Sequence, residues 1–328
     1  MMKTLLIYGA TGYTGRMIAE QATAAGLNVV LAGRDHLKLH ELASELKRQA
    51  SVFTLDDADR LAQKLQGVSV VLNCAGPFAQ TAEPLMNACI QLGIHYLDIT
   101  AEINVYRLAE SLNESALLSG SMLMAGVGWD VVPTDSLSVM LAQQVNTPVK
   151  LRIALQVAGS MSRGSAISAG EIISAGLLAR VNGVLMTKAN SATEWFDFGE
   201  GKVECFPLSF GDLVTAWHST RIPNIEMYVH LSGDAFPSGD LSQLPDGPTP
   251  EEREKSIARA LVEITAANGE VHDAVIETVN GYSYTPLAAI AAVSRVLKGD
   301  HQPGFQTPAK VFGPDFALSI PGTRIITR

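Results

Sequence analysis

The stretch Leu-Leu-Ile-Tyr-Gly-Ala-Thr-Gly-Tyr-Thr-Gly, residues 5–15, decides the fold of this chain. Its apolar run over 5–8 predicts a buried strand, and the amphipathic pattern after residue 13 predicts a helix. In a dinucleotide-binding turn, three glycines permit the tight turn, the approach of the pyrophosphate and the close packing of helix on strand. The sequence therefore predicts a dinucleotide site here, or else a strand–helix turn that binds nothing. The residues expected to bind the cofactor are Gly9, Thr11, Gly12, Tyr13, Thr14 and Gly15.

The end of the next predicted strand, over 28–32, bears on which cofactor binds. An NAD enzyme usually places a carboxylate there for the ribose 2′-hydroxyl, whereas an arginine can pair with the 2′-phosphate of NADP. Arg34 comes first in this chain and Asp35 follows it, so the sequence favours NADP and leaves NAD open. In the alternative interpretation, Arg34 is solvated and Asp35 caps a helix that begins at His36.

Composition sets the broad class of the protein. A chain of 328 residues, 47% of them hydrophobic, can form two domains with cores of their own. The net charge of −9 argues against nucleic acid as a partner, which would require a basic face. The three cysteines fit neither a disulfide framework nor a zinc site, so we expect no metal and a reducing, cytoplasmic location.

Two further observations concern membranes. No uninterrupted apolar stretch reaches the ~18 residues that a membrane-spanning helix needs. The first predicted strand begins near residue 3, which leaves no room before it for a signal peptide. We therefore expect no integral membrane segment.

Strands and helices alternate over the first 133 residues, which predicts an α/β fold with a doubly wound parallel sheet, the Rossmann arrangement. After residue 133 the pattern predicts a second, α+β domain with one antiparallel or mixed sheet. The predicted domains are 1–133, which binds NADP, and 134–328, for substrate and dimerisation, with a tail of about 285–328 that packs back on the first. In the second domain we expect strands over 150–157, 225–231 and 271–279, helices over 168–181, 251–267 and 286–297, and a surface loop over 236–250.

Small residues follow the predicted strand over 68–73. Ala75, Gly76 and Pro77 would let the nicotinamide half of a cofactor lie against the backbone, although an ordinary strand–helix turn also fits them. Asp56 follows the predicted strand over 51–55, where an adenine would lie. It is a candidate either for a cofactor contact or for a helix cap.

Candidate proton donors also follow the strands. Asp98 lies near the end of the predicted strand over 95–99 and Glu102 follows it, and Asp130 comes after the strand over 121–127. A partly desolvated carboxyl group has a raised pKa and suits general acid–base catalysis, but each of these residues has a structural alternative as a cap or hinge. Tyr282 and Tyr284 are further candidates if the second domain contributes the proton donor.

These stretches together resemble the saccharopine dehydrogenase-like NADP-binding family, which includes the trans-acting enoyl reductases. The resemblance implies a Rossmann domain, an inserted substrate domain and NADP, and it implies little about the substrate. Ala101 departs from the pattern, because members of the family often carry glycine there. The resemblance rests on the glycine turn and on residues 32–34, 73–78, 95–98 and 129–135, and continues weakly at 281–286 and 304–309.

We therefore predict an NADP-dependent oxidoreductase that transfers hydride to or from a small or medium carbonyl, imine or enoyl substrate. A non-catalytic NADP(H)-binding sensor or scaffold is the alternative, because no motif identifies the proton donor. Neither the Tyr-x-x-x-Lys pair of short-chain dehydrogenases nor the Gly-x-Ser-x-Gly turn of α/β-hydrolases is present. The expected partners are a small-molecule substrate and a second copy of the chain, bound through the second domain.

Overall fold

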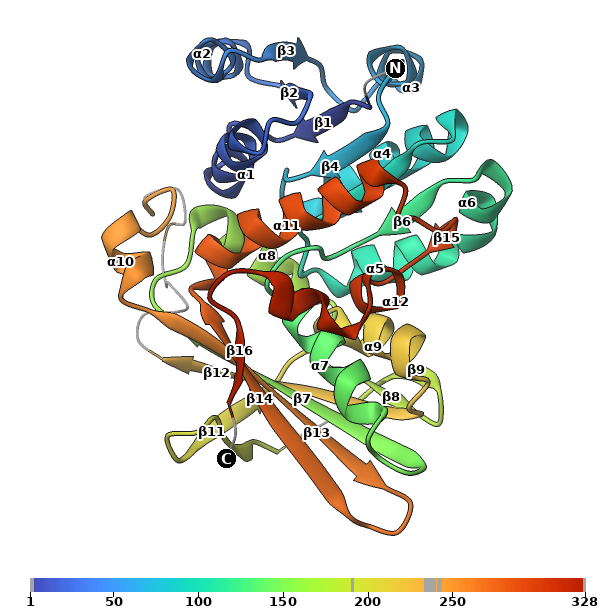
Figure 1. The fold of residues 1–328 in the computed structure, drawn as a ribbon, viewed down its shortest axis with the longest axis vertical. Helices are drawn as coiled ribbons and strands as arrows, with labels where there is room; N and C mark the ends of the chain where they lie inside the picture. Colours follow the sequence, from blue (N-terminus) through green and yellow to red (C-terminus); the bar gives the residue numbers. More distant parts are fainter. Residues whose placement is uncertain (1–2, 190–191, 233–239, 241–243, 327–328) are drawn as a thin grey trace. The chain divides into compact units, whose positions relative to one another are not determined.

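The computed structural model describes residues 3–189, 192–232, 240 and 244–326 (Figure 1). The chain forms two compact units: unit 1 comprises Met1–Thr100, Asn104–Gly128 and Thr285–Gln306, and unit 2 comprises Ala101–Ile103, Trp129–Tyr284 and Thr307–Arg328. The domain boundary drawn after residue 133 stays a prediction. Of the surface loop predicted over 236–250, residues 236–239 and 241–243 lie outside the described residues.

Unit 1 contains a seven-stranded sheet in the order β15-β6-β5-β4-β1-β2-β3, and every strand pair in it is parallel (Figure 1). The order reverses between β1 and β4, and ligands of such sheets bind beyond the carboxyl ends of the strands at that reversal. The strands are β1 Leu5–Tyr8, β2 Val29–Gly33, β3 Gln49–Val52, β4 Val70–Asn73, β5 His95–Asp98, β6 Met122–Met124 and β15 Gly304–Phe305.

Helices connect these strands, so the predicted Rossmann-like α/β fold is confirmed. Helices α1 and α2 pack on β1, β2 and β3, and α4 packs on β4 and β5. The core between them is apolar, and Leu5, Leu6 and Ile7 of β1 have no exposed surface. The helices of unit 1 are α1 Tyr13–Ala24, α2 His36–Leu46, α3 Ala58–Lys64, α4 Phe78–Leu92, α5 Ile103–Ser111 and α6 Asn113–Ser119, together with most of α11 Gly281–Lys298.

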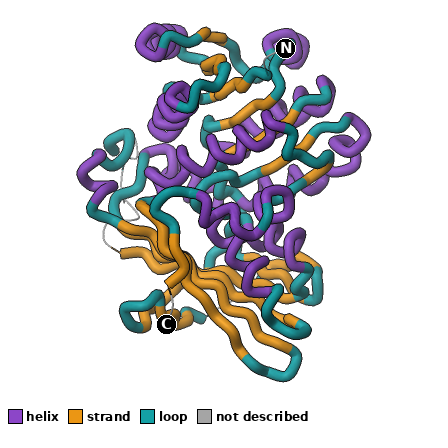
Figure 2. Tube along the Cα trace, viewed as in Figure 1, coloured by secondary structure: helices purple, strands orange, loops and turns teal. Residues whose placement is uncertain are grey.

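Unit 2 contains a nine-stranded mixed sheet, as the second half of the sequence predicted (Figure 2). Its strand order is β10-β11-β12-β7-β13-β14-β16, and β8 joins β12 to β9. Only β12 and β7 are parallel among the described pairs of this sheet. The strands are β7 Pro148–Ala158, β8 Leu178–Val181, β9 Val184–Thr187, β10 Glu194–Asp197, β11 Lys202–Pro207, β12 Asn224–Ser232, β13 Ile257–Ala266, β14 Val271–Val279 and β16 Arg324–Ile326.

Alternation along the central strands separates the two faces of this sheet. Ile153 pairs with Val262 on the apolar face, where both side chains are fully buried and helices α7 (Val132–Ala142) and α9 (Asp212–Thr220) pack on the sheet. On the other face Arg152 pairs with Glu263, and their side chains form an ion pair. A residue period of two thus places the helix-covered core on one face, and on the other face it places ion pairs beside a second buried apolar cluster that includes Ala154, Leu261 and Val275.

Two of the helix predictions for the second half of the chain were wrong in part. Residues 251–267 form only the short helix α10 (Pro250–Glu254) followed by β13, because the stretch from Ile257 is buried almost throughout and pairs with β7 and β14 along its length. Residues 168–181 form the end of α8 (Arg163–Ser174) and then β8, because Gly176 adopts a left-handed φ of 74° and ends the helix.

Two short helical segments follow in unit 2. They are α12 Pro308–Phe312 and the 3-10 helix Pro314–Ser319. No helix in the described part of the chain is long and apolar enough to cross a membrane.

Candidate functional site

The glycine turn between β1 and α1 has a distinct steric reason for each glycine. Gly9 has a φ of 81°, and a Cβ on it would lie 2.7 Å from the backbone nitrogen of Ala75. A Cβ on Gly15 would lie 2.1 Å from the carbonyl oxygen of Gly9. These two positions therefore require glycine because of the protein's own packing.

Gly12 differs from its two neighbours. Its φ of −72° and ψ of 164° suit any residue, and the nearest atom to a Cβ there would be Gly9 O, at 3.4 Å. Neither backbone strain nor a protein contact therefore requires glycine at this exposed position. The space in front of Gly12 lies at the N-terminus of the twelve-residue helix α1, which favours an anion, and Thr11, Tyr13 and Thr14 are half-buried around it. The turn thus fits a pyrophosphate.

The end of β2 holds Arg34 and Asp35 as the sequence predicted. Both residues are exposed, and Asp35 caps α2 by accepting a hydrogen bond of 3.1 Å from the backbone N–H of Lys38. The carboxylate that would receive an NAD ribose is therefore already a helix cap.

Asp56 lies beyond the end of β3 and is exposed. It accepts a hydrogen bond from the hydroxyl of Thr54, which holds the pKa of Asp56 below its ordinary value. The cap of α3 is its neighbour Asp57, which accepts a hydrogen bond of 3.0 Å from the N–H of Arg60. Asp56 is therefore not the cap of that helix, and its contact with a cofactor stays a prediction.

Tyr8, which we did not select from the sequence, lies between Arg34 and Asp56. Burial raises the pKa of its phenol, while the charge of Arg34 lowers it and that of Asp56 raises it. Its ring packs on Phe53 with 5.2 Å between centroids. A buried aromatic side chain therefore adjoins the two charged groups at the ends of β1, β2 and β3. The signal in the sequence was a tyrosine as the last residue of the first strand.

The loop after β4 contains Ala75, Gly76 and Pro77, and the Gly76–Pro77 peptide is cis. Ala75 donates its N–H to Asn73 Oδ1 over 3.0 Å, and its carbonyl accepts a hydrogen bond of 2.7 Å from Thr81 Oγ1. Because Gly9 and Ala75 are in backbone contact, the structure brings this loop and the glycine turn side by side. The predicted pyrophosphate and nicotinamide positions thus adjoin one another in unit 1.

Asp98, a predicted proton donor, is fully buried at the end of β5. Its Oδ2 accepts a hydrogen bond of 2.9 Å from Tyr96, and its Oδ1 accepts from the N–H groups of Thr100, at 3.1 Å, and Gly126, at 2.8 Å. These contacts join the ends of β5 and β6, which is a structural task. Its catalytic role stays a prediction.

Glu102 and Tyr282, both in unit 2, contact the same helix, α8. Glu102 is buried and accepts a hydrogen bond of 2.7 Å from Ser168 Oγ. The Tyr282 hydroxyl donates to Ser165 Oγ over 2.9 Å and accepts from the N–H of Ser162 over 2.7 Å. Because Ser165 and Ser168 are three residues apart on one helix, the carboxyl and phenol groups lie along one face of α8.

Tyr284, in contrast, has no exposed surface, and burial raises the pKa of its phenol. Its hydroxyl has no hydrogen-bond partner among the described residues. It is therefore a poor donor to a substrate, which leaves Tyr282 as the better candidate of the two tyrosines.

Asp130 belongs to an acid cluster in unit 2, which we define as Asp130, Asp135 and Asp212. Desolvation raises the pKa of Asp130 to about 6 and that of Asp135 to about 6. The pKa of Asp212 is also raised, first by burial and then by the charge of Asp135. Thr134 Oγ1 donates a hydrogen bond of 2.9 Å to Asp212 Oδ2, so this threonine contacts a carboxyl group of the cluster.

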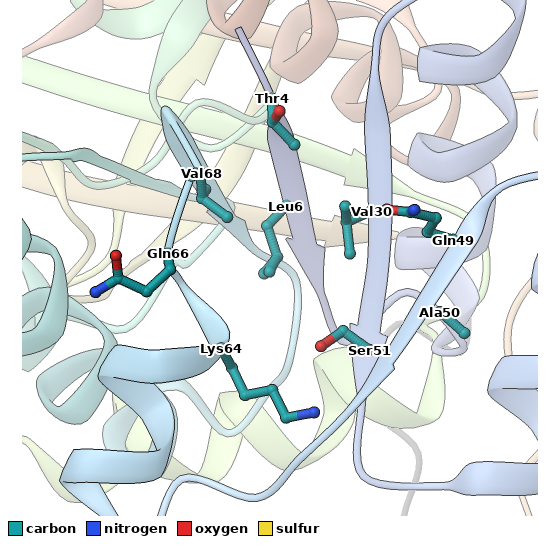
Figure 3. A pocket seen from close by; sticks show the side chains of 10 residues that line it. Thr4, Leu6, Val30, Gln49, Ala50, Ser51, Lys64, Gln66 and Val68 are labelled. Carbon is teal, nitrogen blue, oxygen red and sulfur yellow. The ribbon is translucent and has the colours of Figure 1, made fainter.

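A cavity of about 490 Å³ lies elsewhere in unit 1 (Figure 3). Its floor contains Leu6 and Val30 from the middle of β1 and β2, and Lys64 and Gln66 from the end of α3 and the turn after it form one side. It includes none of the predicted site residues. Figure 3 shows its polar side chains around an apolar floor.

The described residues contain no group of three or more His, Cys, Asp or Glu side chains placed to hold a metal ion.

Comparison with known proteins agrees with this geometry. Residues 5–120 match the family model described as saccharopine dehydrogenase NADP binding domain. A trans-acting enoyl reductase of Mycobacterium tuberculosis is 30% identical over 40% of this chain and 33% of its own length. A probable mitochondrial saccharopine dehydrogenase-like oxidoreductase of Arabidopsis thaliana is 27% identical over 44% of this chain and 36% of its own.

 Each matched segment covers about a third of the relative's length.

Solved structures extend the likeness to the whole fold. An apo saccharopine dehydrogenase (L-Glu forming) from Saccharomyces cerevisiae superposes with a TM-score of 0.67 at 13% identity, over 99% of this chain and 100% of that one. A myo-inositol dehydrogenase from Corynebacterium glutamicum superposes with a TM-score of 0.51 at 12% identity, over the whole of both chains. At these identities the likeness concerns the fold alone. Residues 5–120 are therefore similar to the NADP-binding domain of saccharopine dehydrogenases, as the sequence motifs predicted.

Proposed function

We propose that this protein is an NADP-dependent oxidoreductase that transfers hydride to or from a small or medium carbonyl, imine or enoyl substrate. The observation that carries the proposal is Gly12, a glycine that neither the backbone conformation nor the protein's packing requires, at the N-terminus of α1. An anion that must approach the backbone closely gives this position a reason to lack a side chain. The relatives named as reductases and oxidoreductases support the same reaction class.

The choice of NADP over NAD rests on Arg34. Its guanidinium is exposed just beyond β2, where the 2′-phosphate would lie, and it can form a bidentate contact with that group. Asp35 supports the same choice, because its carboxylate already caps α2. The aromatic side chain of Tyr8 and the carboxylate of Asp56 then lie near the adenosine end.

The nicotinamide is assigned to the loop of Ala75, Gly76 and Pro77, next to the glycine turn. NADPH supplies a hydride when bound, and the chain must supply a proton. Asp130 has a pKa of about 6, close to the operating pH that favours a general acid. Glu102 and Tyr282, which contact one face of α8, are the other candidates.

The division of tasks follows the predicted domains. We assign cofactor binding to residues 1–133 and substrate binding and homodimerisation to residues 134–328, in a protein of the cytoplasm. The acidic balance of the chain, with a net charge of −9, supports a small-molecule substrate over nucleic acid.

A pair of titrations tests the cofactor assignment, and a turnover assay tests catalysis. NADPH and NADH fluorescence should each be followed as protein is added, with tighter binding of NADPH expected. Absorbance of NADPH should then fall when a ketone, an imine or an enoyl thioester that serves as substrate is added. Binding without turnover across all three substrate classes favours the sensor or scaffold, and binding of neither cofactor contradicts the proposal.

A further inference from the structure

Both backbone polar groups of Ala75 are held by side chains. Its N–H donates to Asn73 Oδ1 over 3.0 Å, and its carbonyl accepts from Thr81 Oγ1 over 2.7 Å. A loop whose peptide is fixed on both sides cannot shift without breaking hydrogen bonds in a mostly buried site. This restraint acts on the loop to which the proposed function assigns the nicotinamide.

Each hydrogen bond behind this loop has one possible direction. Asn73 must turn Oδ1 toward the N–H of Ala75, so its Nδ2 donates to Thr81 Oγ1 at 3.0 Å and to the Tyr96 hydroxyl at 3.1 Å. The Tyr96 hydroxyl then donates to Asp98 Oδ2 at 2.9 Å. The carboxylate of Asp98 accepts only, and it ends the series.

The series is buried, and it extends beyond the loop. Asn73, Tyr96 and Asp98 have no exposed surface. Asp98 Oδ1 also accepts the N–H groups of Thr100 and Gly126, so the ends of β4, β5 and β6 depend on one carboxylate. Removing one member leaves buried polar groups unpaired, which costs more than the bond itself contributes.

The glycine turn also depends on this arrangement. The backbone of Ala75 lies against Gly9, where a Cβ would come within 2.7 Å of Ala75 N. A displacement of Ala75 would therefore alter the space beside the pyrophosphate turn.

We propose that Asn73, Thr81, Tyr96 and Asp98 form a positioning network that fixes the Ala75–Pro77 loop for the nicotinamide half of the cofactor. The inference rests on the proposed function, and it assigns Asp98 to cofactor positioning instead of proton transfer. None of the four side chains needs to contact the cofactor. Their effect is to keep the loop in one conformation before the cofactor binds.

The test compares two ligands that differ in the nicotinamide half. NADPH occupies the whole predicted site, whereas adenosine 2′,5′-bisphosphate occupies only the adenosine end. Thr81→Val removes one hydroxyl at nearly constant shape, and Tyr96→Phe removes another. Each should weaken NADPH about tenfold and leave the affinity for adenosine 2′,5′-bisphosphate within about twofold. Thr81→Ser, which restores a hydroxyl, should regain most of the NADPH affinity.

Thr4→Val is the matched control. Thr4 Oγ1 accepts a hydrogen bond of 2.8 Å from Asn28 Nδ2 before β1, at the opposite end of the same sheet. The Thr4→Val variant should bind NADPH and adenosine 2′,5′-bisphosphate as tightly as the unmodified chain does. Asp98→Asn tests the carboxylate itself, because its amide would donate toward Tyr96 and reverse the order of the network. A positioning role predicts weaker NADPH binding, whereas a pure proton donor would leave that affinity unchanged.

Thermal unfolding of every variant separates positioning from loss of the fold. If the variants bind NADPH as tightly as the unmodified chain, the proposal of a positioning network is wrong. So do variants that lose both ligands equally together with a lower melting temperature. If the unmodified chain binds both ligands and the variants bind NADPH equally well, the network assignment fails alone. If it binds neither, the proposed function fails, and the network assignment fails with it.

Discussion

A buried carboxylate of unit 1 and one of unit 2 differ in the hydrogen bonds that they accept. In unit 1, Asp98 accepts two backbone N–H groups and one phenol. In unit 2, Asp135 accepts the N–H of Ala309 at Oδ2, while its Oδ1 has no hydrogen-bond partner in the described part of the chain. The donors around Asp98 fix nearby loops, whereas burial raises the pKa of Asp135 to about 6 against the lowering effect of its hydrogen bonds, so Asp135 binds a proton more readily.

This difference separates binding from stability. Substitutions at the strand ends of unit 1 should change cofactor affinity and leave the fold largely intact. Substitutions in the acid cluster of unit 2 should change stability in a pH-dependent way and leave cofactor affinity unchanged. Three experiments follow from this comparison.

The largest effect is expected at Gly12. Gly12→Val places a branched side chain where the pyrophosphate would lie, so NADPH affinity should fall by at least about 100-fold with little change in melting temperature. Gly15→Val is the matched variant, because its Cβ would meet Gly9 O at 2.1 Å and should lower the melting temperature as well. Normal NADPH binding by Gly12→Val would mean that the phosphates bind elsewhere.

A smaller effect, on stability, is expected at Asp135. Its folded-state pKa of about 6 exceeds its ordinary value of 3.8. The protonated form is therefore favoured by folding, and the stability that it contributes is complete below about pH 4 and lost as the pH rises through 6. At pH 8 the ionised group costs on the order of 3 kcal/mol.

Asp135→Asn should therefore stabilise the protein at pH 8 and have much less effect at pH 4.5, measured by urea unfolding at both pH values. The Asn side chain can still accept the N–H of Ala309. Asp57→Asn, at an exposed helix cap, is the control and should show no such pH-dependent gain. A loss of stability at Asp135→Asn that is equal at both pH values would contradict the role of proton binding.

The smallest effect is expected at Arg34. Arg34→Ala should remove most of the preference for NADPH over NADH, about 1.5–3 kcal/mol for a charge-assisted contact. Arg107→Ala, another exposed arginine of unit 1, should keep the preference. Fluorescence titration gives the dissociation constants of NADPH and NADH for each variant. Equal affinity of the unmodified chain for both cofactors would refute the assignment of Arg34 to the 2′-phosphate.

The strand ends of unit 1 were predictable because their requirements are local. Gly9 and Gly15 lie within a few residues of the strand and helix that they join, and Arg34 follows its strand directly. The network behind Ala75 was not predictable, because Asn73 and Tyr96 are 23 residues apart and meet only when β4 pairs with β5. Thr81 gave no signal beyond its place on a helix.

Unit 2 was less predictable for related physical reasons. The stretch that forms β13 was mistaken for a helix, because the charged and alanine residues at its start favour a helix, and its burial as a strand depends on pairing with β7 and β14. The acid cluster joins Asp135 to Asp212, which the sequence separates by an intervening strand-rich region. Tertiary packing, which no local pattern contains, brings them together.

A crystal structure with NADPH bound tests the central claim most directly. The account predicts the pyrophosphate at Gly12, the 2′-phosphate within hydrogen-bond distance of Arg34, and the nicotinamide against Ala75, Gly76 and Pro77. A pyrophosphate bound away from the glycine turn, or a 2′-phosphate that no cation of the β2 end contacts, would contradict it.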